Sequence, residues 1–194
     1  SIMTWVVDTS SPSDLFPILD TINQLSTHPL SAARTLFTDD APLIIGRAPG
    51  RLDLMGDIAD YSGSLVLQLP IREATFATIQ RTIEPTLTII SLTSEADLGR
   101  VDDNAVFQMH LADFHEAGDR SANPIGYAEA QTYFQRDEAT NWAAYIAGAF
   151  LVLMREEGFR FEHGARILIQ STVPEGKGVS SSAAVEVATM ICLL

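Results

Sequence analysis

One segment rich in glycine and serine has the composition of an anion-binding loop. It is Pro174–Ala184, with the sequence PEGKGVSSSAA, and it stands between a predicted strand and a predicted helix. Glycines let successive main-chain N–H groups converge on an anion, the start of a helix adds partial positive charge, and serine hydroxyls supply donors or a Mg²⁺ ligand. The segment is not a Walker A motif, because Lys177 is followed by glycine. It indicates a phosphate-binding loop, with an ordinary serine-rich helix start as the plainer alternative.

A second segment, residues 46–63, gathers charged side chains between two predicted strands. It contains two arginines, three aspartates and four glycines. Carboxylates accept pairs of hydrogen bonds from vicinal hydroxyl groups, so such a loop suits a sugar, and an arginine can neutralise charge that develops on a transferring phosphoryl group. The plainer alternative is a turn-rich connection in which Arg51 pairs with Asp53 at the surface.

Together the two segments resemble the first two signature motifs of the GHMP small-molecule kinases. The first is similar to the sugar-kinase form, an Ala-Pro-Gly-Arg segment followed by a Gly-acid-x-x-Asp-Tyr segment, here Ala48–Arg51 and Gly56–Tyr61. The second is similar to the family's Pro-x-Gly-x-Gly-x-Ser-Ser-Ser-Ala loop and matches it at every fixed position from Pro174 to Ala183. The two motifs also stand in the family's order.

The resemblance implies a fold and an activity. The fold would be α+β, the GHMP kinase amino-terminal domain with a ribosomal-protein-like β-α-β architecture. The order of elements, consecutive strands with separated helices, independently suggests α+β. The activity would be transfer of phosphate from ATP to the anomeric hydroxyl of a monosaccharide, with Mg²⁺ bridging the phosphates.

The resemblance also implies roles for individual residues. Arg51 would lie beside the attacking sugar hydroxyl and the γ-phosphate and stabilise the transferring group. The sugar site would include Asp57, Asp60 and Tyr61, with Asp60 as the main contact because Asp57 is shorter than the family's usual glutamate. Ser181 would be the Mg²⁺ ligand. The ATP phosphates would be bound by the second motif as a whole, namely Pro174, Gly176, Lys177, Gly178, Ser180, Ser181, Ser182 and Ala183. For Lys177, a solvated side chain is the open alternative.

Within the sugar-kinase branch, both motifs are more similar to those of L-arabinokinases than to those of galactokinases. Galactokinases have Glu-His where this chain has Asp57 and Ile58. An isoleucine lacks the hydrogen-bonding group of histidine and adds bulk, which suits a sugar without an exocyclic hydroxymethyl group. We therefore expect L-arabinose as the sugar. The alternatives are a galactokinase, or a non-catalytic regulator of the same superfamily that binds sugar and nucleotide.

Periodicity and turn residues predict the elements that position these segments. Apolar residues at intervals of three and four predict a helix over Leu15–Leu25, capped by Ser13 or Asp14. A strand begins at Leu43 and is stopped by Gly46 and Pro49, and a strand over 65–67 ends at Pro70. Further strands are predicted over 74–80, 86–92, 105–110 and 161–172, and further helices over 31–37, 127–134, 140–157 and 183–194.

Composition argues against several classes of protein. Apolar residues make up 46% of the 194 residues and charged residues 19%, unlike disordered or fibrous chains. The net charge of −13 disfavours nucleic acid and anionic membranes as partners. The longest apolar run, Trp142–Met154, is too short to cross a bilayer, and the four histidines lack zinc-ligand spacing. Because Cys192 is the single cysteine, no internal disulfide can form, and we expect a cytoplasmic protein.

We expect two parts in the chain. Residues 1–40 would form a helical amino-terminal extension, and residues 41–194 the GHMP kinase amino-terminal domain, truncated at its carboxy-terminal end. The last predicted helix ends in the apolar run Met190–Leu194 without a capping residue, and such an end needs a partner. We expect a carboxy-terminal domain to pack there and, by the resemblance, to supply the catalytic aspartate. Activity is then expected of the full-length protein rather than of these residues alone.

Overall fold

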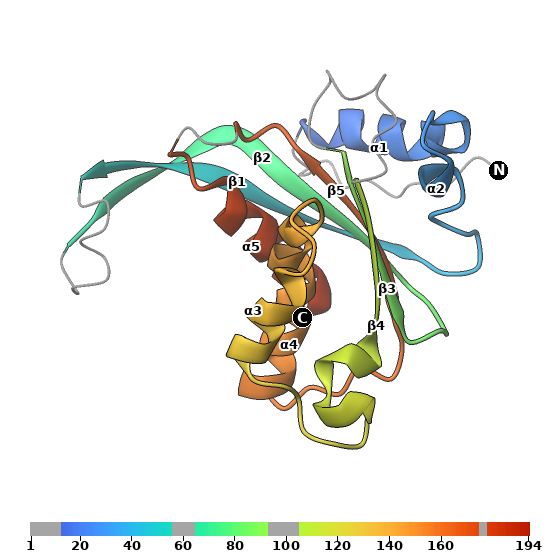
Figure 1. The fold of residues 1–194 in the computed structure, drawn as a ribbon. Coiled ribbons are helices and arrows are strands. Elements are labelled where there is room, and N and C mark those ends of the chain that lie inside the picture. Colours follow the sequence, from blue (N-terminus) through green and yellow to red (C-terminus); the bar gives the residue numbers. More distant parts are fainter. Residues whose placement is uncertain (1–12, 56–64, 93–104, 175–177) are drawn as a thin grey trace.

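A five-stranded mixed sheet forms the centre of the computed structural model, which describes residues 13–55, 65–92, 105–174 and 178–194 (Figure 1). The strands lie in the order β1-β2-β5-β3-β4. Their bounds are β1 Leu43–Met55, β2 Leu67–Arg81, β3 Thr86–Leu92, β4 Val106–His110 and β5 Ala165–Ser171.

Helices lie on both faces of this sheet. They are α1 Leu15–Gln24, α2 Ser31–Arg34, α3 Tyr127–Phe134, α4 Ala144–Glu156 and α5 Ser181–Leu193. Short 3₁₀ turns occur at Leu25–Thr27, Leu111–Phe114, Glu116–Gly118 and Asn141–Ala143. Within the described part of the chain, no helix has the length and apolar character that crossing a membrane requires.

The strand directions identify a β-α-β unit. Strands β1 and β2, β2 and β5, and β3 and β4 are antiparallel, whereas β3 and β5 are parallel. Parallel neighbours need a crossover connection, and here the chain passes through β4, α3 and α4 before it enters β5. The predicted α+β class with a β-α-β arrangement is therefore confirmed.

Helices α4 and α5 cover one face of the sheet and form the main core. Alternation along β5 sends Ile167 and Ile169 to this face, where they are fully buried together with Phe150 of α4 and Ala188 of α5. Gly46 of β1 permits the close approach of α5, because a Cβ atom at this position would lie 2.3 Å from the carbonyl oxygen of Ala188. The position of α5 is thus fixed directly against β1.

Helices α1 and α2 cover the opposite face (Figure 1). Ile18 and Ile22 of α1 are buried in one cluster with Phe76 of β2 and Leu168 of β5. Strand alternation explains this second cluster, since Leu168 points away from its neighbours in the main core. The amino-terminal helices therefore bury apolar sheet surface that water would otherwise contact.

Polar contacts also connect these helices to the sheet. Asp14 stands at the N-cap of α1 but makes no capping hydrogen bond. Its carboxylate instead accepts three hydrogen bonds from Nε and Nη2 of Arg47 in β1, with a shortest Nη2–Oδ2 distance of 2.7 Å. The predicted side-chain cap at Asp14 is therefore wrong, because the arginine is the stronger donor.

A second polar contact connects the segment before β1 to the sheet. The buried amide of Gln80 donates to the carbonyl oxygens of Thr38 and Ala41. A domain boundary at residue 40 stays a prediction.

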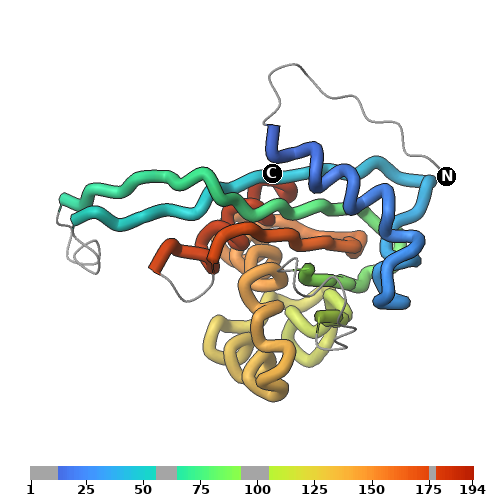
Figure 2. Tube along the Cα trace, turned by 90° about the horizontal axis from the view of Figure 1, so that it is seen from above, coloured from blue at the N-terminus to red at the C-terminus, as the bar shows by residue number. Residues whose placement is uncertain are grey.

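The first hairpin is longer than predicted. Strand β1 continues through Gly46 and Pro49 to Met55, and β2 continues through Pro70. The predicted stops were wrong because each proline stands where its strand has a free edge: β1 is the outermost strand, and β5 pairs only with Thr75–Arg81 of β2. The two strands form an arm that projects beyond the sheet (Figures 1 and 2).

Candidate functional site

The two sequence motifs meet where β1 leaves the sheet. The main-chain N–H of Arg51 donates a hydrogen bond of 3.0 Å to the carbonyl oxygen of Val179, which belongs to the glycine- and serine-rich motif. The preceding residue, Gly50, packs closely against Val173, which directly precedes this motif: a Cβ atom at Gly50 would lie 2.8 Å from Cγ1 of Val173. The arm and the start of α5 therefore form one continuous surface.

Two strand irregularities bracket Arg51 on β1. The pairing with β2 shifts between Pro49 and Arg51 and again between Asp53 and Met55. Such bulges redirect side chains and occur often beside active sites. Between them, Arg51 Nε lies 3.5 Å from Asp53 Oδ1, and the side chains are 43% and 21% exposed. The ion pair considered as the plainer alternative is thus present, but it leaves much of the arginine accessible.

The second motif has a strained backbone at the point where α5 begins. Gly178 has φ +68°, and Ser180 has φ +56° and ψ +47°, the left-handed region that favours glycine. Strain at a non-glycine residue persists only where the surroundings enforce it and is frequent in ligand-binding segments. Ser180 makes no side-chain capping hydrogen bond to the helix, so the first N–H groups of α5 keep their capacity to bind an anion.

The other predicted residues of this motif follow the same helix start. Ser181 and Ser182 open α5, with Ser181 half-buried and Ser182 exposed. Ala183 is half-buried in the first turn, and Pro174 is exposed after β5. Five predicted residues lie outside the described part of the chain: Asp57, Asp60, Tyr61, Gly176 and Lys177.

Comparisons with known proteins assign both motifs to one superfamily. Residues 34–81 match the family model described as "Galactokinase galactose-binding signature", and residues 144–194 match "GHMP kinases N terminal domain". This chain belongs to the GHMP kinases. L-arabinokinase of Arabidopsis thaliana is 48% identical in an alignment of 181 positions; the match covers 82% of this GHMP kinase chain and 17% of the relative. Galactokinase of Exiguobacterium sibiricum is 30% identical over 146 residues, which are 75% of this chain and 30% of the relative.

Solved structures show the same GHMP kinase fold. The galactokinase of Lactococcus lactis, solved as a complex with galactose, superposes with a TM-score of 0.57 at 20% identity, covering 88% of this chain and 34% of that one. The mevalonate kinase of Methanococcus jannaschii gives 0.52 at 17% identity, covering 77% and 38%. At these identities the likeness concerns the fold alone. This chain spans about a third or less of the length of the curated relatives named above.

The described residues of this GHMP kinase contain no group of three His, Cys, Asp or Glu side chains suited to a metal ion. Mg²⁺ does not require such a group, because it commonly binds to substrate phosphates, water and one or two protein oxygens. The hydroxyl of Ser181, at the uncapped start of α5, provides one oxygen of this kind. This hydroxyl fits an Mg²⁺ ion that is bound together with phosphate oxygens.

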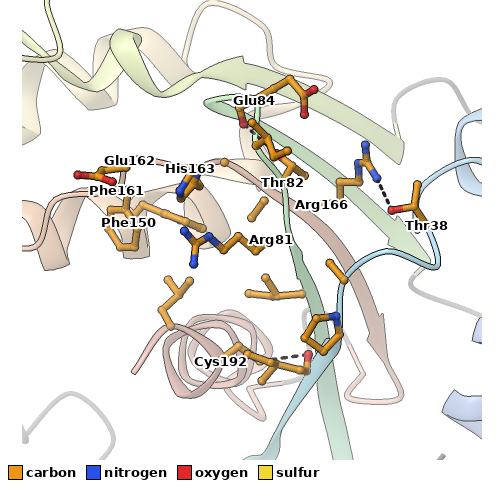
Figure 3. Close-up of a pocket in the computed structure, with 18 of the residues that line it drawn as sticks. Thr38, Arg81, Thr82, Glu84, Phe150, Phe161, Glu162, His163, Arg166 and Cys192 are labelled. Atoms are coloured by element: carbon orange, nitrogen blue, oxygen red, sulfur yellow. Dashed lines mark hydrogen bonds between the residues drawn. The ribbon is translucent and has the colours of Figure 1, made fainter. Parts of the chain in front are cut away.

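A separate hollow of about 840 Å³ lies at the opposite end of α5 (Figure 3). Its lining includes Arg81, His163 and Cys192, and Arg166 donates a hydrogen bond of 3.1 Å to the hydroxyl of Thr38. Of the residues predicted to bind sugar or ATP, those that belong to the described part of the chain do not line it. This hollow could not be predicted from the sequence, because its residues come from segments far apart in the chain.

Proposed function

We propose that this chain is the amino-terminal part of an ATP-dependent sugar kinase that phosphorylates a monosaccharide at its anomeric hydroxyl, with L-arabinose as the first candidate. One observation carries the proposal: the hydrogen bond from Arg51 to Val179 joins the sugar-kinase motif to the phosphate-binding motif. Sugar and ATP must lie next to each other for in-line transfer. A direct contact between the two motifs supplies that proximity.

The phosphates of ATP would bind at the start of α5. Main-chain N–H groups from Gly178 to Ala183 and the hydroxyls of Ser180 and Ser182 are the donors in this proposal, together with the segment that includes Pro174, Gly176 and Lys177. The uncapped helix start and the strained Ser180 support it. When bound with ATP, Mg²⁺ would neutralise phosphate charge, and Ser181 is the proposed protein ligand.

Arg51 is the proposed catalytic residue. Its guanidinium would donate to the transferring phosphoryl group and stabilise the charge that builds up in the transition state. Asp57, Asp60 and Tyr61 would bind the hydroxyl groups of the sugar, with carboxylates as the acceptors. The general base would come from the remainder of the protein, as the resemblance implies.

L-arabinose is preferred over galactose for two reasons. The L-arabinokinase of Arabidopsis thaliana is 48% identical to this chain, whereas the galactokinase of Exiguobacterium sibiricum is 30% identical. Ile58 also stands where galactokinases have histidine, which removes a polar contact and adds bulk. The galactokinase remains the second candidate because the galactose-binding signature matches residues 34–81.

A coupled ADP-release assay on the full-length protein tests this proposal, with L-arabinose, galactose and galacturonate compared at equal concentration. We expect the highest kcat/KM with L-arabinose. Faster turnover of galactose would contradict the role given to Ile58. Binding of sugar and nucleotide by calorimetry without any ADP release would favour the non-catalytic regulator.

A further domain is the proposed neighbour of α5. Val187, Ile191 and Leu194 are 50%, 52% and 81% exposed, so this helix presents apolar side chains to solvent. We propose that the carboxy-terminal domain of the kinase packs against them. The net charge of −13 supports small-molecule ligands rather than nucleic acid or membrane surfaces. The cytoplasm is the proposed location, since the single thiol cannot form an internal disulfide.

A further inference from the structure

The projecting arm separates polar from apolar side chains. Arg51 and Asp53 alternate with Leu52 along β1, so they share one face of the strand while Leu52 points to the other. Leu52 is paired with Leu69 of β2, and both are exposed. The face of the arm that carries Arg51 and Asp53 is therefore the one that can bind a charged or polar ligand.

The two arginines of β1 are held in different ways. Arg47 binds Asp14 through two nitrogens, Nε at 3.0 Å and Nη2 at 2.7 Å, so two of its three guanidinium nitrogens take part in the ion pair. Arg51 approaches Asp53 only through Nε, at 3.5 Å. Among the described residues, neither Arg51 Nε nor Asp53 Oδ1 has a hydrogen-bond partner, although both atoms are buried. The charge of each buried atom is therefore compensated by the opposite charge of the other, 3.5 Å away.

Contact through Nε has a specific chemical consequence. A guanidinium has five N–H donors in a rigid planar fork, and the two amino groups form the end that binds phosphate oxygens in pairs. A carboxylate placed at Nε restricts the rotation of the fork without occupying that end. The main chain of Arg51 is already fixed by its bond to Val179, so Asp53 restricts the part of the residue that remains free.

We propose that Asp53 is a positioning residue of this kinase, which holds the guanidinium of Arg51 by its Nε and leaves both amino groups for the transferring phosphoryl group. This inference rests on the proposed function. Phosphoryl transfer depends on donors that are oriented before the reaction. Losing Asp53 then lowers kcat while the KM for ATP, which reflects mainly the start of α5, stays nearly constant.

The test compares Asp53→Ala and Asp53→Asn in the full-length protein, with kcat and KM for ATP and for the sugar measured separately. We expect Asp53→Ala to lower kcat about tenfold and to change the KM for ATP less than twofold. Asp53→Asn keeps an acceptor oxygen of the same size, so we expect it to restore kcat to within about threefold of the wild type. This partial rescue is not expected of a residue that only stabilises the fold.

Asp14→Ala is the matched control. It breaks the other Arg–Asp pair of β1, between Arg47 and α1, and should lower thermal stability without changing kcat. A double variant completes the test: in an Arg51→Ala background, Asp53→Ala should change kcat less than twofold, because no guanidinium is left to position.

The outcomes separate this inference from the proposed function. A wild-type protein without sugar kinase activity would refute the proposed function, and the inference with it. An active wild type whose kcat is unchanged by Asp53→Ala would refute the inference alone. An equally large loss from Asp53→Ala in the Arg51→Ala background would also refute it, because Asp53 would then act independently of Arg51.

Discussion

The main-chain N–H of Arg51 lies 3.0 Å from the carbonyl oxygen of Val179 and donates a hydrogen bond to it. The bond joins two segments that are far apart in the sequence, because strands β2 to β5 lie between them. Because only main-chain atoms take part, any non-proline residue at position 51 can keep it. Side-chain variants of Arg51 therefore leave the junction of the two motifs intact and report on the guanidinium alone.

Replacing Arg51 by alanine should lower kcat by well over tenfold in the full-length protein. The guanidinium is the proposed source of charge stabilisation for the transferring phosphoryl group, and such groups act mainly in the transition state. Steady-state kinetics with saturating ATP and sugar measure the effect. The control is Arg81→Ala. Arg81 is an exposed arginine at the carboxyl end of β2, and its replacement should leave kcat unchanged. Wild-type turnover by Arg51→Ala would remove Arg51 from the mechanism.

Ser180 should store backbone strain that glycine relieves. Its φ of +56° lies in the left-handed region, where a residue with a Cβ atom costs roughly 1 kcal/mol more than glycine. Ser180→Gly and Ser180→Ala both remove the hydroxyl, so the difference between them isolates the strain. Urea unfolding should find the glycine variant more stable than the alanine variant by about 0.5–1 kcal/mol.

The same pair of variants tests the role of the hydroxyl. If Ser180 binds a phosphate of ATP, calorimetry should find both variants weaker for nucleotide than the wild type, by severalfold. Equal stability of the two variants would contradict the strain, and unchanged nucleotide affinity in both would contradict the hydroxyl contact.

The elements that the sequence predicted well are those with a strong local pattern. Helix α1 has apolar residues at intervals of three and four, and β3 is a short β-branched run between turn residues. The long strands of the arm were missed because Gly46, Pro49 and Pro70 signal turns locally. Tertiary context decides otherwise: Gly46 is required beneath α5, and both prolines stand at free strand edges.

The candidate site was only partly accessible from the sequence. Local chemistry singled out Arg51 and the serines from Ser180 to Ser182, and the resemblance to a family placed them in one site. The left-handed conformation of Ser180 could not be predicted, because serine normally avoids it. The partner of Arg47 was also hidden, since Asp14 lies 33 positions earlier in the chain and its position suggested a helix cap.

Gly46→Ala should destabilise the protein and weaken nucleotide binding together. The added Cβ atom would lie 2.3 Å from the carbonyl oxygen of Ala188 and 2.7 Å from Sγ of Cys192. Since the first of these is helix backbone, α5 must move, and overpacking of this kind costs about 1–3 kcal/mol. The helix carries the proposed phosphate site at its start, so its displacement should also lower ATP affinity.

Gly148→Ala provides the control for this prediction. Gly148 lies in α4, and a Cβ atom there meets nothing within 4 Å. Alanine is the better helix former by up to about 1 kcal/mol, so this variant should be as stable as the wild type or more stable. Urea unfolding and nucleotide titration of both variants check the contrast. A Gly46→Ala protein with wild-type stability would show that α5 does not pack on β1 as described.

Cys192 should make the folded protein sensitive to alkaline pH. Burial raises the pKa of its thiol from 9.0 to about 11, against a smaller opposite effect of a hydrogen bond with the main chain of Gly46. In the folded state the thiol also donates to the carbonyl oxygen of Ala77 at 3.3 Å, and it lines the hollow at the end of α5 (Figure 3). The raised pKa and the hydrogen bond to Ala77 indicate a protonated, unreactive thiol at neutral pH.

The direction of the pH effect follows from proton linkage. Between pH 9 and 11 the unfolded chain has lost the thiol proton while the folded chain retains it, so a rising pH favours unfolding. Relative to Cys192→Ala, the wild type should lose roughly 1–2 kcal/mol of unfolding free energy between pH 8.5 and 10.5. Urea unfolding at both pH values measures this difference, and groups that the two proteins share cancel. A constant difference between wild type and variant across this range would show that the thiol ionises equally in both states. Alkylation at pH 8 gives a second measurement, because the native thiol should react only as fast as the chain opens.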